Sequence, residues 1–194
     1  MPQMLEGQES EVMVMFYTGV GSRETPQDIL TLQRKVAAKL AKEGHILRSG
    51  GADGSDIYFE YGSDDVNGSK EIYISWDNPK STHGRIYYHN NRDVFKLDLS
   101  PKKEDAMILA SEIHPAWDRC SQAAQKLHSR NMFQVLGYRL DTPSKFLICY
   151  AIPQGDSVKG GTRTAFECAK KHGIPVFNMY REDVQERFIK YLDK

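Results

Sequence analysis

The sequence has few cysteines, and none of them is placed for a disulfide or a metal. Cys120, Cys149 and Cys168 are odd in number and far apart, and no C-x-x-C pair occurs. The six histidines form no H-E-x-x-H motif. A chain of 194 residues buries about 70% of its unfolded surface, so it needs no covalent support. We therefore predict free thiols, with Cys149 buried and inert, no metal site and no cofactor.

The sequence also lacks a net charge and any long apolar run. Lysine plus arginine equals aspartate plus glutamate at 26 each, so no overall field draws the chain to nucleic acid or to a membrane. No stretch approaches the roughly 18 apolar residues of a membrane span. We expect a cytosolic protein with no membrane partner, in which residues 1–10 are a loose tail and residues 11–194 form one domain.

What the sequence does have is a repeated order of strand, glycine turn and helix. Apolar runs predict buried strands over 12–18, 45–48, 70–75, 145–150 and 174–178. Between and after them, helical spacing of apolar residues predicts helices, with Thr25 as a cap of the first and a break near Pro115. Residues 76–100 lose this pattern, and we interpret them as a loop excursion. The predicted fold is α/β: a Rossmann-like, doubly wound, mainly parallel sheet with helices on both faces.

Three glycine turns follow strands of this predicted sheet. In such sheets ligands bind beyond the carboxyl ends of the strands, where helix amino termini and free amides face outward. The first turn contains Gly19, Gly21, Ser22 and Arg23. Its glycines allow the backbone to approach a ligand, and Arg23 is a candidate bidentate phosphate donor. The alternative is an ordinary turn with a solvated arginine.

The second turn is the richest in glycine. It runs through Ser49, Gly50, Gly51, Ala52 and Asp53, and adjacent glycines favour a nest of backbone amides that holds an anion. Asp53 or Ser55 is placed to cap the helix that follows. Asp56 is placed either to accept a hydrogen bond from a ribose hydroxyl or to interact favourably with the positive end of the helix dipole.

The third turn contains Gly160, Gly161 and Thr162 and again opens a helix. Thr162 suits both helix capping and phosphate binding, and these two roles compete. A P-loop is excluded because Gly-Lys-Ser/Thr is absent at its spacing. Trp76, after the third strand, is placed to stack on a base, or else to pin the excursion to the body.

Taken in order, the segments 17–23, 49–56 and 160–162 resemble the SLOG superfamily, which includes DNA-processing protein A and the Lonely-Guy phosphoribohydrolases. The block 129–137 resembles the form of this domain found in bacteriophage genomes. The resemblance implies a nucleotide site formed by the three turns. It also implies that Arg130 corresponds to an arginine of those hydrolases, and that relatives commonly form homo-oligomers.

The resemblance fails at the residue expected to catalyse cleavage. The hydrolases carry Pro-Gly-Gly-x-Gly-Thr-x-x-Glu, whereas Ala165 stands three residues after Thr162 in this chain. Glu167 lies about 200° around the helix from Ala165 and is a poor substitute. Asp53, Asp56 and Glu60 remain as other carboxylate candidates.

Our main expectation is therefore binding of a nucleotide or nucleotide-derived small molecule without hydrolysis. One alternative is an N-glycosidase or transferase that acts on a nucleoside phosphate. The other is a module that binds single-stranded DNA, against which the neutral overall charge weighs.

Overall fold

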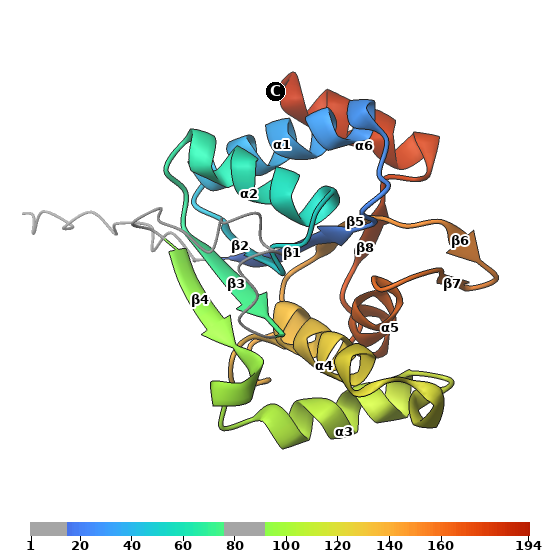
Figure 1. Ribbon diagram of the computed structural model, residues 1–194. Helices are drawn as coiled ribbons and strands as arrows, with labels where there is room; N and C mark the ends of the chain where they lie inside the picture. Colours follow the sequence, from blue (N-terminus) through green and yellow to red (C-terminus); the bar gives the residue numbers. More distant parts are fainter. Residues whose placement is uncertain (1–14, 76–91) are drawn as a thin grey trace, which may run out of the picture.

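The structure is a computed structural model that describes residues 15–75 and 92–194. Its centre is a six-stranded, fully parallel sheet in the order β4-β3-β2-β1-β5-β8 (Figure 1). The strands are β1 (Phe16–Gly21), β2 (Ile46–Ser49), β3 (Lys70–Ile74), β4 (Arg92–Lys96), β5 (Leu147–Tyr150) and β8 (Val176–Asn178). The strand order reverses between β1 and β5, which places a topological switch point there.

Helices cover both faces of the sheet (Figure 1). One layer consists of α1 (Gln27–Lys42), α2 (Ser55–Asp65) and α6 (Glu182–Leu192), and the other of α3 (Lys103–Ile113), α4 (Gln122–Leu136) and α5 (Arg163–Lys171). Two short 3-10 helices, η1 (Leu97–Leu99) and η2 (Trp117–Arg119), flank α3. The strands β6 (Pro153–Gln154) and β7 (Ser157–Val158) form a small hairpin after β5. None of the helices in the described ranges has the length and apolar character of a membrane span.

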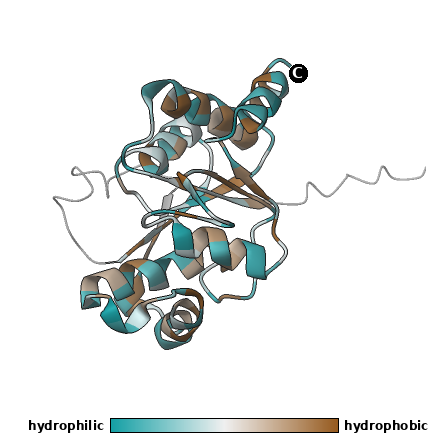
Figure 2. Ribbon diagram, turned by 90° about the vertical axis from the view of Figure 1, so that its right-hand side faces the viewer, coloured by the Kyte–Doolittle hydropathy of each residue, from teal (hydrophilic) through white to brown (hydrophobic). Residues whose placement is uncertain are grey.

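The two layers bury two hydrophobic cores, because each central strand presents apolar side chains to both faces. Figure 2 shows hydrophobic residues along the strands between the two helical layers. Tyr17 and Ile148 point to the core under α1, α2 and α6, whereas Val20 and Leu147 point to the core over α4 and α5. This alternation along β1 and β5 is what a buried parallel strand requires.

The predicted α/β fold is confirmed, with differences at element ends. The described part of β1 begins at Phe16 and extends to Gly21, beyond the predicted end at Thr18. The interpretation of 76–100 as an excursion is wrong for 92–99, because β4 pairs with β3 and Leu97 is buried. Residues 1–10 and 76–91 lie outside the described residues.

The cysteines agree with the sequence expectation. All three are free, and Cys149 and Cys168 are buried. Burial raises the pKa of both thiols to about 12, so neither ionises readily at neutral pH.

Gly19 has a packing role that a substitution can test. A Cβ at Gly19 would lie 2.7 Å from Cγ of Phe59 and 3.0 Å from Cδ1 of Leu47, and both of those side chains are buried. We expect Gly19→Ala to lower the free energy of unfolding by about 1–3 kcal/mol through overpacking, as measured by urea denaturation. Gly161→Ala is the control, because its Cβ would only touch Leu127 at 3.4 Å. Equal stability of the two variants would contradict this account.

Candidate functional site

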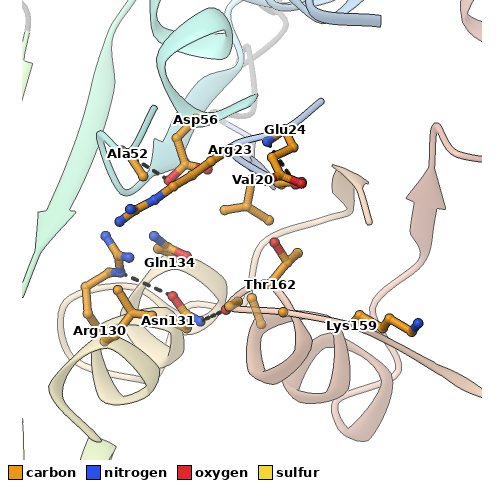
Figure 3. Close-up of a pocket in the computed structure, with 16 residues that line it drawn as sticks. Val20, Arg23, Glu24, Ala52, Asp56, Arg130, Asn131, Gln134, Lys159 and Thr162 are labelled. Atoms are coloured by element: carbon orange, nitrogen blue, oxygen red, sulfur yellow. Dashed lines mark hydrogen bonds between the residues drawn. The ribbon is translucent and has the colours of Figure 1, made fainter. Parts of the chain in front are cut away.

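A cavity of about 360 Å³ lies at the carboxyl ends of β1 and β5, at the switch point of the sheet (Figure 3). It is bounded by the first turn, the start of α2, one face of α4 and the third turn. The lining residues are Val20, Gly21, Ser22, Arg23, Glu24, Ala52, Asp56, Leu127, Arg130, Asn131, Gln134, Lys159, Gly160, Gly161, Thr162 and Ala165. Three of these side chains are cationic and two are carboxylic acids.

The first and second turns are bonded to each other. The amide of Ser55 donates to the carbonyl of Ser22 at 3.3 Å, and the hydroxyls of Thr25 and Ser55 lie 2.8 Å apart. Thr25 also donates to the carbonyl of Ser22, so its hydroxyl does not cap α1 as predicted. The predicted side-chain cap of α2 is also absent, because its N-cap is Gly54 and Ser55 bonds to Thr25 instead. These bonds hold the first turn over the start of α2.

Arg130 is the buried centre of the site. Its Nη1 donates to the carbonyl of Gly50, just after β2, at 2.9 Å and to the carbonyl of Tyr73, near the end of β3, at 3.0 Å. Its Nε donates to Oδ1 of Asn131 at 3.2 Å. Burial lowers the pKa of Arg130, the nearby Asp56 raises it, and Arg23 lowers it. Arg23 is therefore close enough for its charge to act on Arg130.

Gly50 must lack a side chain for this arrangement. A Cβ at Gly50 would overlap the guanidinium of Arg130 and the amide of Gln134. With its amide oxygen turned toward the second turn, Gln134 accepts from the Gly50 amide and from Nε of Arg130, each at 3.2 Å. The Gly50 amide therefore already donates to Gln134 and is not free to bind an anion, so the predicted anion nest does not form at Gly50.

Asp56 is a buried carboxyl beside the two arginines. Burial raises its pKa to about 6, although Arg130 and the amides of Ala52 and Gly21 act in the opposite direction. The Ala52 amide donates to Oδ2 of Asp56 at 3.4 Å. Both protonation states of Asp56 are therefore accessible near neutral pH.

The third turn is held by a side chain from α4. Nδ2 of Asn131 donates to the carbonyl of Gly161 at 2.7 Å and to the hydroxyl of Thr164 at 2.9 Å. Thr162 is the N-cap residue of α5, but its hydroxyl makes no capping bond. Of the two predicted roles, helix capping is therefore not performed by Thr162. Its side chain lines the cavity, where the hydroxyl can contact a ligand.

The structure brings nine of the predicted ligand-binding residues to the cavity: Gly21, Ser22, Arg23, Ala52, Asp56, Arg130, Gly160, Gly161 and Thr162. Five others do not line it: Gly19, Ser49, Gly50, Gly51 and Asp53. Gly19 packs on Phe59, and the hydroxyl of Ser49 donates to the carbonyl of Gly19 at 2.6 Å. Gly51 has a φ of +70°, a left-handed backbone conformation that favours glycine, so this position needs glycine for the conformation of the turn. Trp76 lies outside the described residues.

Sequence reasoning missed the polar wall that α4 contributes. Leu127, Arg130, Asn131 and Gln134 recur at the spacing of one helix face, and all four line the cavity. That spacing would have identified them once Arg130 was chosen. Ala165 also lines the cavity, so the chain presents a methyl group where the resembled hydrolases carry glutamate.

Comparisons with known proteins give structural neighbours only. No family model matches the chain, and no curated protein matches it. The chain resembles the crystal structure of DNA processing protein A from Streptococcus pneumoniae, with a TM-score of 0.56 and 16% identity over 92% of this chain. The chain spans 56% of that protein's length.

A second solved structure concerns the single-stranded DNA binding mode of DNA processing protein A from Helicobacter pylori. It matches with a TM-score of 0.39 and 16% identity, over 92% of this chain and 80% of that one. The Streptococcus pneumoniae neighbour shows that the chain has a fold like that of DNA processing protein A.

The raised pKa of Asp56 predicts how stability changes with pH. Since the folded pKa of about 6 exceeds the ordinary aspartate pKa of 3.8, the protonated carboxyl stabilises the fold below about pH 4, and this contribution is lost as the pH rises through about 6. Asp56→Asn keeps the neutral form at every pH. Relative to the parent, we expect this variant to gain roughly 3 kcal/mol of unfolding free energy between about pH 4 and about pH 8.

Urea denaturation across this range measures the difference between the two proteins. Asp156→Asn, at an exposed aspartate of the β6-β7 hairpin, is the control and should not produce this change. Parallel pH profiles for the parent and Asp56→Asn would show that Asp56 is not a strained buried acid.

Proposed function

We propose that the cavity binds one nucleotide of a single-stranded DNA chain and holds its phosphate between Arg23 and Arg130 without cleaving it. The observation that carries this proposal is the meeting of two guanidinium groups from opposite walls. In Figure 3, Arg23 extends from the first turn toward the head of Arg130 on α4. Both residues line the cavity.

The two neighbouring positive charges of Arg23 and Arg130 favour the binding of an anion between them. The charge of Arg23 lowers the pKa of Arg130, which means that the two cations repel each other. Within the described ranges, Arg23 forms no salt bridge, and the side-chain hydrogen bonds of Arg130 use Nε and Nη1 but not Nη2. A phosphate can accept bidentate hydrogen bonds from both groups and remove the repulsion.

The rest of the cavity suits the other parts of a nucleotide. Val20, Leu127 and Ala165 provide an apolar wall for a base or the carbon face of a sugar. Thr162 and the start of α5 add a hydroxyl and helix amides. Asp56 can accept from a base amino group.

The choice of DNA as ligand rests on the fold. The neighbour from Streptococcus pneumoniae is a DNA processing protein, and its likeness favours the DNA alternative over a free nucleotide. A cavity of about 360 Å³ has room for about one nucleotide, so the rest of a strand would run outside it. Lys159 lies at the cavity edge and points away from the two arginines in Figure 3, where it can meet a neighbouring phosphate.

The second candidate is the free nucleotide or nucleotide-derived molecule that the sequence favours. Two observations support it: the cavity holds a single unit, and the chain has no net charge to attract a polyanion. Both candidates use the same phosphate position. Binding without cleavage is supported by Ala165, while the glycosidase alternative would have to use Asp56 or Glu24, the two carboxylic acids that line the cavity, as its acid or base.

Arg23→Gln tests the phosphate position. Arg23 is exposed and has no ion pair among the described residues, so its loss should leave the fold intact. We expect the affinity for a fluorescein-labelled oligodeoxythymidylate, measured by anisotropy, to fall about 10- to 100-fold through the loss of charge-assisted hydrogen bonds. The matched control is Arg181→Gln, which removes an exposed arginine that pairs with Asp183 on α6. Equal affinities for Arg23→Gln and the parent would contradict the proposal.

Salt and competition separate DNA from a free nucleotide. If a strand is the ligand, its affinity should fall steeply with salt, and mononucleotides should compete only weakly. Mononucleotides that compete as well as the strand, with little salt dependence, would select the second candidate. Mass spectrometry of the same mixtures tests cleavage, because free base released by the parent but not by Asp56→Asn would establish the glycosidase instead.

A further inference from the structure

We propose that His114, Cys120 and His128 form a binding site for one transition metal ion, with Zn²⁺ as the ion that fits the ligand set. The three residues come from the end of α3, the end of η2 and the middle of α4. They meet where α3 turns back onto α4 (Figure 1). The proposal does not depend on what the cavity binds.

The geometry suits a single ion. One ligand atom from each residue lies within 4.8 Å of the other two, and Sγ of Cys120 is 3.7 Å from Nε2 of His114. In a tetrahedral zinc site with bonds of about 2.0 Å to nitrogen and 2.3 Å to sulfur, such atoms are about 3.5 Å apart. Small side-chain adjustments are therefore enough to bring all three atoms to one ion.

His128 is already oriented for this role. Its side chain is buried, and its Nδ1 lies 2.8 Å from the hydroxyl of Thr164. A hydrogen bond at one ring nitrogen fixes the orientation of a metal-binding imidazole and leaves the other nitrogen to the metal. Asn131 donates to the same hydroxyl at 2.9 Å, so Thr164 is itself held in place.

His114 needs one local change. Its Nδ1 accepts from the Ala116 amide at 3.0 Å, which places the proton of the neutral ring on Nε2. When Nε2 binds the ion, that proton leaves Nε2, Nδ1 takes up a proton, and the Ala116 bond is released. The thiol of Cys120 loses its proton to solvent, since a thiolate is the ligand.

The residue types favour zinc and its borderline neighbours. Two imidazoles and one thiolate suit Zn²⁺ or Co²⁺ better than Mg²⁺ or Ca²⁺, which prefer oxygen ligands. Three protein ligands leave a fourth tetrahedral position for water.

Metal titration of the whole chain tests the site. We expect native mass spectrometry to find one retained Zn²⁺ per chain, and Co²⁺ to give a thiolate-to-metal charge-transfer band. Cys120→Ser should abolish the band, and both Cys120→Ser and His114→Ala should weaken Zn²⁺ binding by about tenfold or more. Neither residue is fully buried, and circular dichroism without metal checks that both variants fold.

The chain offers a matched control. Sγ of Cys168 lies 3.8 Å from Nδ1 of His172, which makes a second cysteine-histidine contact. In the described ranges this pair belongs to no cluster of three possible metal ligands. Cys168→Ala should therefore keep both the bound Zn²⁺ and the cobalt band. The proposal fails if the parent retains no stoichiometric metal, or if the Cys120 and His114 variants bind it as the parent does.

Discussion

The carboxyl edge of the sheet depends on the burial of one guanidinium. Arg130 reaches from α4 to the second turn, and its Nη1 donates to the carbonyl of Gly50, just after β2, and to the carbonyl of Tyr73, near the end of β3. A buried charge is tolerated only when hydrogen bonds and an opposite charge replace water, and here these are the two carbonyls, Asn131 and the field of Asp56. The same requirement excludes a side chain at Gly50. An arginine held in this way keeps its remaining donors at the cavity, so the constraint that fixes the fold also prepares the site.

Much of the fold could be predicted from the sequence because the central strands are largely buried and contain short apolar runs, as in Leu147–Tyr150 of β5. β4 escaped prediction because Val94 and Phe95 are its only apolar residues and it lies at the sheet edge, where one side needs no strand partner. The first and third turns lie close together because of the parallel topology. The first turn follows β1, the third follows β5 and the short β6-β7 hairpin, and β1 and β5 end at the same edge of the sheet. The occupation of the Gly50 amide could not be predicted, because its acceptor, Gln134, lies 84 residues further along the chain.

The histidine and cysteine cluster was missed for a related reason. Its members are separated by six and eight residues, which matches no metal-binding spacing, and only the packing of α3 on α4 brings them together. The sequence expectation of no metal site rested on motifs alone. A sequence motif identifies ligands that are close together along the chain. These three residues instead come from three different elements, the ends of α3 and η2 and one face of α4.

The cavity and the cluster share one polar chain. His128 contacts Thr164, Thr164 accepts from Asn131, and Asn131 holds both the Gly161 carbonyl and Nε of Arg130. Asn131 has one carbonyl and one amino group, and both are engaged, so this side chain connects Thr164 to the third turn and to Arg130. An ion that fixes His128 would therefore favour one position of the cavity wall. Because coupling between two binding sites is reciprocal, a ligand that prefers that wall position would bind the metal-loaded chain more tightly, and would tighten metal binding by the same factor.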